Sequence, residues 1–193
     1  MPVGEAQASF QAAAARDGVL LDQAKVPWIN QRGHFGLPPE AADAWDALDV
    51  IFRELGGDPS VQAAKKLTPL PGDFIHRPTG TFIETDEMQH FTSFRLKTLE
   101  LYPDGIPLAF DLGAYSVHCQ ELASQADKYR ATKEASGFGR GGRQRQRAYY
   151  DALRDLAVPA MGHPPLIRIP IFDGDGRAAW FRHRDYILAA LIE

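Results

Sequence analysis

The chain has 193 residues, of which 45% are hydrophobic and 24% charged, as is ordinary for a globular protein of about one domain. The single cysteine, Cys119, excludes an internal disulfide framework, and no apolar run approaches the roughly 20 residues of a membrane span. The Ala-rich stretch after Glu5 lacks the basic leader of a secretory signal, so we expect a cytoplasmic protein with no membrane partner. The net charge of −4 argues against a protein that coats nucleic acid nonspecifically.

The first sixty residues are predicted to be mainly helical. Residues 7–16 are rich in Ala, and a clearer helix begins at Pro38 and stops at Gly56. Its apolar residues keep helical spacing: Ala41, Ala44, Trp45, Leu48, Ile51, Phe52 and Leu55. We expect residues 1–60 to form a helical extension that packs on a core formed by residues 61–193.

Two short apolar runs follow, at residues 70–76 and 81–86. Both are bounded by turn residues and carry Phe and Ile, so they are predicted to be strands that pair as a hairpin. Alternation along the second run places Phe82, Glu84 and Asp86 on one face of the sheet. In such a hairpin, a carboxylate of the first strand can approach those of the second.

The carboxylates of this hairpin predict a metal site. Asp73 lies in the first run, and Glu84 and Asp86 lie in the second. Three converging carboxylates repel one another unless a hard cation lies among them, and their oxygen atoms suit Mg²⁺ or Mn²⁺. Two other interpretations stay open. Asp73 and Glu84 could be exposed carboxylates of an edge strand, and Asp86 with Gln89 could cap a helix that begins near Phe91.

The remainder of the chain alternates between helical and extended patterns. The predicted elements, in order, are helices at residues 91–101, 115–131 and 146–155, strands at 166–172 and 178–181, and a helix at 185–192. Pro170 marks an edge or an end of the first of these strands, because proline cannot donate to a sheet. Cys119 falls on the apolar stripe of its helix and is expected to be a core thiol.

Positive charge is concentrated in one part of the chain. Residues 128–154 contain eight basic and two acidic residues, a net charge of +6. This segment is a candidate for contact with phosphates, although a solvated helix face would have the same composition. The arginines that we expect to bind nucleic acid are Arg140, Arg143, Arg145, Arg147 and Arg154.

Several of these motifs together resemble the PD-(D/E)XK nuclease superfamily. Asp73-Phe74 precedes a turn, residues 83–90 read apolar-Glu-x-Asp-x-x-Gln-His, and the polar helix at 146–155 leads into the apolar run at 166–169. The pattern is closest to the very-short-patch-repair endonuclease branch, and it covers roughly residues 60–172.

The resemblance implies a restriction-endonuclease-like α/β core, with a mixed central sheet flanked by helices and additional N-terminal helices. It further implies a Mg²⁺-dependent endonuclease that hydrolyses the DNA backbone, in defence or repair, with RNA as an alternative substrate. In this branch, Asp73, Glu84 and Asp86 would hold the metal, and Gln89 and His90 would assist.

One position departs from the superfamily pattern. The usual Lys, two residues after the acidic ligand, is Asp86 here, so Gln89 and His90 are the polar neighbours available to position water or phosphate. A neutral His90 could also accept a proton near pH 7. The alternative function is a catalytically degenerate nuclease fold that serves as a binding or assembly module. The sequence leaves open whether the protein acts as a homodimer or with another protein.

Overall fold

The computed structural model describes residues 4–192 and has an α/β fold with a four-stranded mixed sheet. The strands lie in the order β1 (Asp22–Gln23), β2 (Phe74–His76), β3 (Thr81–Glu87) and β4 (Ile167–Ile171). Strand β2 is antiparallel to both β1 and β3, whereas β3 and β4 are parallel. The predicted hairpin is therefore confirmed as β2 and β3.

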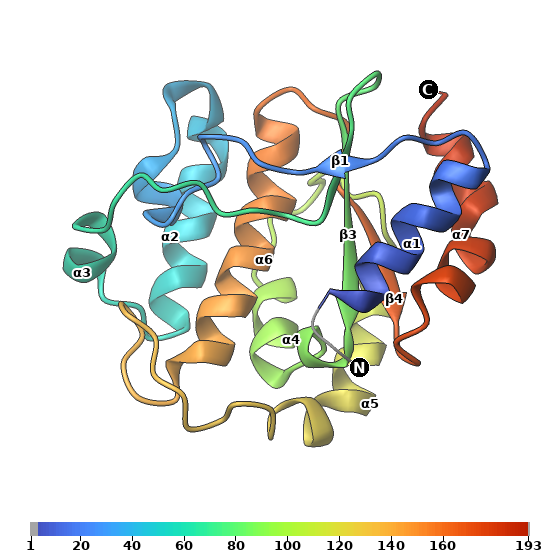
Figure 1. Cartoon of the computed structure of the whole chain (residues 1–193). Helices are drawn as coiled ribbons and strands as arrows, with labels where there is room; N and C mark the ends of the chain where they lie inside the picture. The colour runs from blue at the N-terminus through green and yellow to red at the C-terminus, as the bar shows by residue number, and fades with distance from the viewer. Residues whose placement is uncertain (1–3, 193) are drawn as a thin grey trace.

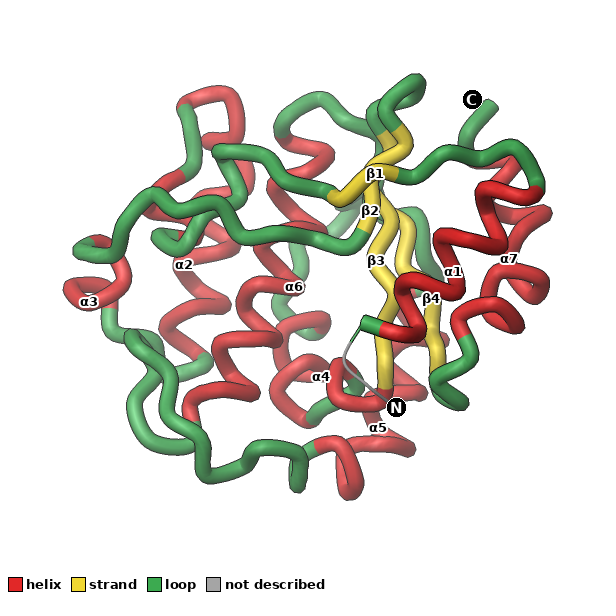
Figure 2. Tube along the Cα trace, viewed as in Figure 1, coloured by secondary structure: helices red, strands yellow, loops and turns green. Residues whose placement is uncertain are grey.

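Helices cover both faces of the sheet (Figures 1 and 2). One face carries α1 (Glu5–Arg16) and α7 (Gly176–Ala190), and the long helix α6 (Gly142–Ala160) lies on the other, with α2 (Trp45–Glu54) beyond it. The remaining helical elements are α3 (Pro59–Ala63), α4 (Ser93–Leu99), α5 (Leu112–Ala126) and the 3₁₀ turns Gly33–Gly36, Pro39–Ala44 and Met88–His90.

The alternation of β3 separates two of the hydrophobic clusters of the core. Phe82 packs with the α2 and α6 side chains, whereas Ile83 packs with the α1 and α7 side chains. Parallel β4 repeats the pattern: Ile167 and Ile169 face α1 and α7, so Arg168 between them faces α6. As the sequence predicted, Glu84 and Asp86 share the face of Phe82, and both are buried beneath α6.

The two ends of the chain pack against each other. Phe10 of α1 contacts Trp180 of α7 edge to face, with ring centroids 5.5 Å apart, and the Trp180 indole nitrogen donates to Asp17 at 2.7 Å. Backbone spacing is very close here, because a Cβ at Gly176 would lie only 1.8 Å from the Ala6 carbonyl oxygen. The contact fixes α1 beside the sheet.

Two local predictions were wrong. Residues 178–181 are not a strand but part of α7, which begins after Asp175 and buries Ala179, Trp180 and Ile187. The helix periodicity extends over fifteen residues and overrides the short apolar run.

The second wrong prediction concerns helix capping. Asp86 lies within β3, and the cap of α4 is Thr92, whose hydroxyl oxygen accepts from the Arg95 amide at 3.0 Å. By contrast, Pro170 lies in the edge strand β4, as expected, and Cys119 is a buried core thiol whose burial raises its pKa to about 12. Within residues 4–192, no helix combines the length and the apolar character needed to cross a membrane.

Candidate functional site

The sheet brings Asp73 and Glu84 together. Phe74 pairs with Ile83, so Asp73, one residue before β2, lies opposite Glu84. The Asp73 amide donates to Glu84 Oε1 at 3.1 Å. Asp73 Oδ2 accepts two hydrogen bonds from Thr85, from the amide at 2.8 Å and from the hydroxyl at 2.5 Å. The Asp73 side chain thus satisfies a β3 amide at the point where β2 has not yet begun.

A glycine permits this close approach. A Cβ at Gly72 would lie 2.4 Å from Glu84 Oε1, and the Gly72 amide donates to the Ala24 carbonyl oxygen at 2.7 Å. The Pro71-Gly72-Asp73 turn therefore passes directly over the Glu84 carboxylate. Any side chain at residue 72 would displace Glu84.

The Asp73 and Glu84 carboxylates carry more negative charge than their surroundings neutralise. Burial raises the pKa of Asp73, although hydrogen bonds from Thr85 partly oppose this. Burial also raises the pKa of Glu84 from 4.5 to about 7, and the charge of Asp73 adds to the effect. Arg154 offsets part of it, because its Nε lies 3.5 Å from Glu84 Oε1.

Each of these two carboxylates has one oxygen left open. Asp73 Oδ1 and Glu84 Oε2 accept no hydrogen bond from any residue in the described range 4–192. Both oxygens are in contact with solvent, because neither is among the solvent-inaccessible side-chain atoms that lack a hydrogen-bond partner in residues 4–192. Two open carboxylate oxygens beside solvent can serve as ligands of a hard cation that keeps several waters.

Asp86 is in a different situation, although it lies on the same face. Its side chain is fully buried, and both carboxylate oxygens accept from Arg168 Nη1, at 2.9 and 3.0 Å. Tyr115 donates to Oδ2 at 2.7 Å. Arg168 continues to Asp155 at 2.7 Å, and Asp155 contacts Arg95 at 2.5 Å. The structure therefore does not bring Asp86 to the open oxygens of Asp73 and Glu84.

Of the three carboxylates predicted to hold a metal, the structure brings together only Asp73 and Glu84. Among the described residues, no group of three or more His, Cys, Asp or Glu side chains is placed to hold a metal ion. The pair of Asp73 and Glu84 still fits Mg²⁺, which is commonly bound through one or two carboxylates with waters completing its shell.

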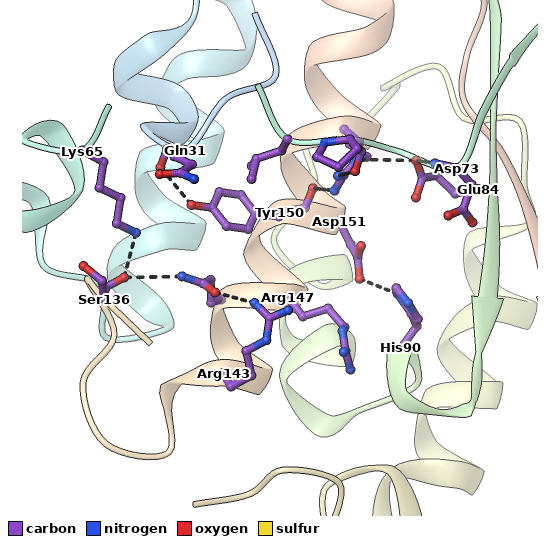
Figure 3. A pocket seen from close by; sticks show the side chains of 14 residues that line it. Gln31, Lys65, Asp73, Glu84, His90, Ser136, Arg143, Arg147, Tyr150 and Asp151 are labelled. Carbon is purple, nitrogen blue, oxygen red and sulfur yellow. Dashed lines mark hydrogen bonds and ion pairs between the residues drawn. The ribbon is translucent and has the colours of Figure 1, made fainter. Parts of the chain in front are cut away.

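Asp73, Glu84 and His90 line two adjoining cavities, which we call together the groove. The first has a volume of about 580 Å³ and runs along α6 (Figure 3). The second has a volume of about 490 Å³ and is bounded by α1 and the segment around Gln89. Because the carboxylate pair borders both cavities, it is accessible from each of them.

His90 lies beside the carboxylate pair, and its surroundings favour its protonated form. Its Nδ1 lies 2.9 Å from Asp151 Oδ2 and 3.4 Å from Asp86 Oδ1. Burial opposes protonation of the ring, but the two carboxylates outweigh it and raise the pKa of His90. Burial likewise acts to raise the pKa of Asp151, yet the His90 charge and hydrogen bond lower it overall. The raised pKa favours the imidazolium, which does not support a neutral His90 as proton acceptor.

Gln89 lies beside the second cavity. Its amide donates to Glu87 Oε2 at 2.5 Å, and its backbone carbonyl accepts from Arg147 at 3.1 Å. Through these contacts Gln89 ties the end of β3 to α6. Its side chain borders the groove but does not contact Asp73 or Glu84 directly.

The basic segment divides into two groups. Arg143, Arg147 and Arg154 line the first cavity, whereas Arg140 and Arg145 do not. Arg145 instead donates to backbone carbonyls, among them those of Leu55 at 3.1 Å and Phe138 at 2.6 Å, so it stabilises the loop before α6.

One basic residue of the cavity was not predicted. Lys65, just after α3, points into the first cavity from the opposite side to α6 (Figure 3). The sequence offered no signal for it, because it is remote from the basic segment and reaches the cavity only through tertiary packing.

No protein-family model, curated protein or solved structure matches this chain. A functional argument therefore depends on the groove and its side chains.

Proposed function

We propose that the protein is a metal-dependent phosphodiesterase with a restriction-endonuclease-like core, and that it hydrolyses the DNA backbone in the groove. The observation that carries the proposal is the Asp73–Glu84 pair, with one open oxygen on each carboxylate, in a groove that also carries arginines. Carboxylates for a hard cation and cations for phosphates are the two requirements of this chemistry.

In this proposal Asp73 and Glu84 hold Mg²⁺ or Mn²⁺, and Asp86 is not a ligand. A bound metal ion supplies a lowered pKa for a coordinated water and neutralises charge on the phosphate. The raised pKa values of Asp73 and Glu84 agree with this role, because burial disfavours their charged forms, the neighbouring carboxylate charges add to the effect, and a bound cation would offset both.

Asp86 and His90 together replace the superfamily's usual Lys. Asp86 cannot supply a positive charge, but it helps to hold the proton of His90. His90 Nε2 accepts and donates no hydrogen bond within the described residues, and its ring borders both cavities. The imidazolium can donate from Nε2 to a phosphate oxygen, while Arg143 and Arg147 bind the flanking backbone.

The test is cleavage of labelled DNA, single- and double-stranded, with Mg²⁺ or Mn²⁺. Asp73→Asn and Glu84→Gln should remove metal-dependent cleavage. Asp104→Asn and Glu100→Gln, which change exposed carboxylates in the same way, should retain it. If Asp73→Asn and Glu84→Gln cut DNA as fast as the wild type, the proposal is wrong. The same assay on RNA decides which polymer is the substrate.

A second candidate is a non-catalytic module that binds a phosphate backbone in the groove. Two observations favour it. The described residues hold no group of three potential metal ligands, and the Asp86 carboxylate forms an ion pair with Arg168. If the protein is a binding module, the wild type and Asp73→Asn should bind DNA with the same affinity, and metal should change neither affinity. Cleavage that requires Asp73 would exclude it as the full account.

A further inference from the structure

The first cavity has two ends with opposite charge. Asp73 and Glu84 lie at one end, and Lys65 and Arg143 lie at the other, with Arg147 between them and His90 (Figure 3). The cationic end combines side chains from separate parts of the chain, the segment after α3 and the first turns of α6. We call Lys65, Arg143 and Arg147 the cationic cluster.

No member of the cationic cluster forms an ion pair with a carboxylate of the described residues. Lys65 Nζ donates to Gln62 Oε1 at 2.6 Å and to the Ser136 carbonyl oxygen at 2.7 Å. Arg143 donates to Gln146 Oε1 at 2.6 Å.

Arg147 likewise has only a neutral acceptor, the Gln89 carbonyl oxygen. Among residues 4–192, no carboxylate lies within 4.0 Å of any member of the cluster. Arg154, by contrast, is beside Glu84.

Burial makes this lack of carboxylates costly. It lowers the pKa of Lys65 and that of Arg147; the charge of Asp151 opposes the effect on Arg147, and the charge of Arg143 adds to it. Arg143 and Arg147 repel each other in a partly desolvated place, and Lys65 faces the same cavity. An anion bound among them would relieve this repulsion, and each would contribute a charge-assisted hydrogen bond.

The cationic end is also bounded by the protein. The hydrogen bond from Lys65 to Ser136 joins the segment after α3 to the loop before α6, and both residues line the cavity. Gln146 reaches the same Ser136 carbonyl at 3.5 Å. A nucleic-acid strand that lies along α6 and starts at the carboxylate pair would end at the Lys65–Ser136 hydrogen bond, which blocks its path.

We propose that the cationic cluster binds a terminal phosphate monoester of the nucleic-acid strand. A monoester carries a charge of about −1.5 to −2 near pH 7, whereas an internal phosphodiester carries only one negative charge, so the monoester matches three unpaired cations better. The inference rests on the proposed function for its polymer. It adds that the protein binds the strand at a phosphorylated end.

The test compares short oligodeoxynucleotides that differ only at one end, 5′-phosphate against 5′-hydroxyl and 3′-phosphate against 3′-hydroxyl. Fluorescence anisotropy in the presence of a chelator separates binding from hydrolysis. The wild type should bind one phosphorylated end about tenfold more tightly than the matching hydroxyl end, the equivalent of one charge-assisted hydrogen bond.

Lys65→Gln should abolish that preference while binding the hydroxyl-ended strand within about threefold of wild type, because only the end contact is lost. Arg143→Gln should also abolish the preference, but it should weaken binding of both strands because Arg143 contacts the flanking backbone as well. Lys66→Gln, which changes the exposed neighbouring lysine, should keep it. Thermal melting of each variant confirms that it is folded.

Equal affinity for phosphorylated and hydroxyl ends in the wild type, or a preference that survives in both Lys65→Gln and Arg143→Gln, overturns the inference. The Asp73→Asn variant, measured in both the binding and the cleavage assay, separates this inference from the proposed function. A preference for a phosphorylated end, with no metal-dependent cleavage by the wild type or any variant, would support the phosphate site and refute hydrolysis. Absence of binding to every oligonucleotide would refute both.

Discussion

Glu84 and Asp86 lie two residues apart on the same face of β3, and the protein surrounds them in opposite ways. Asp86 is enclosed by Arg168 and Tyr115, and Arg168 carries the ion-pair network onward to Asp155. Glu84 has a distant partner in Arg154 and a second carboxylate, Asp73, close by. The Asp86 carboxylate is therefore neutralised within the core, whereas the Glu84 carboxylate faces the groove and is only partly neutralised.

The difference shows that neighbouring carboxylates of one strand can contribute to stability in opposite ways. A buried ion pair with saturated hydrogen bonds is costly to break, because removal of one partner strands the other charge. A buried pair of carboxylates that lacks sufficient positive charge lowers the free energy of unfolding when no cation is bound. The raised pKa values of Asp73 and Glu84 are consistent with the second case.

The largest effect should follow disruption of the Asp86 network. Arg168→Met leaves Asp86 and Asp155 buried without their guanidinium, so it should lower the free energy of unfolding by about 3–5 kcal/mol. Urea denaturation measures the loss. Arg182→Met, which breaks the exposed ion pair with Asp173, should cost less than about 1 kcal/mol. Equal losses in the two variants would refute the assignment of Asp86 to the core.

A smaller effect should appear in the pH dependence of stability. The pKa of Glu84 is about 7 in the folded protein and near 4.5 when unfolded, so the folded state binds more protons between these values. The contribution of Glu84 to the free energy of unfolding therefore falls as pH rises from about 4.5 to 7.

The Glu84→Gln variant isolates this contribution. Without metal, its stability relative to wild type should increase across that pH interval and then level off. His90, whose pKa is also raised, contributes to both proteins alike: its stabilisation is present below pH 6.5 and is lost as pH rises through its folded pKa. A difference between the two proteins that stays constant with pH would contradict the raised pKa of Glu84.

The smallest effect should come from Asp73→Asn. Asparagine keeps an oxygen that can accept from the Thr85 amide and hydroxyl, and it removes a charge that burial disfavours. The free energy of unfolding at neutral pH without metal should change by less than about 1 kcal/mol. A loss as large as that of Arg168→Met, measured in the same urea series, would mean that the Asp73 charge is structural.

The sequence predicted the hairpin and its carboxylates because alternation and turn residues are local signals. Glu84 shares a face with Asp86, as predicted, and Asp73 approaches Glu84, as a hairpin of residues 70–76 with 81–86 allows. The same local reasoning could not separate the two carboxylates of β3. That distinction depends on Arg168, which reaches Asp86 from a strand eighty residues away in the sequence.

Other features were missed for a similar reason. Strand β1 has two residues and no periodicity to detect, and Lys65 joins the groove only because α3 packs beside the loop before α6. Arg140 and Arg145 share the composition of the basic segment, but they lie outside the first cavity. Charge counted along a chain does not show which side chains the fold uses for its own carbonyl groups.

The central claim is that Asp73 and Glu84, without Asp86, hold a divalent cation. Thermal melting with increasing Mn²⁺ or Mg²⁺ tests it most directly, because a ligand of the native state raises its stability. We expect a metal-dependent rise in Tm for wild type and for the Asp104→Asn control, larger at pH 8 than at pH 6 because the ligands must be deprotonated. We expect no rise for Asp73→Asn. An equal rise in wild type and Asp73→Asn, or none in wild type, would contradict the claim.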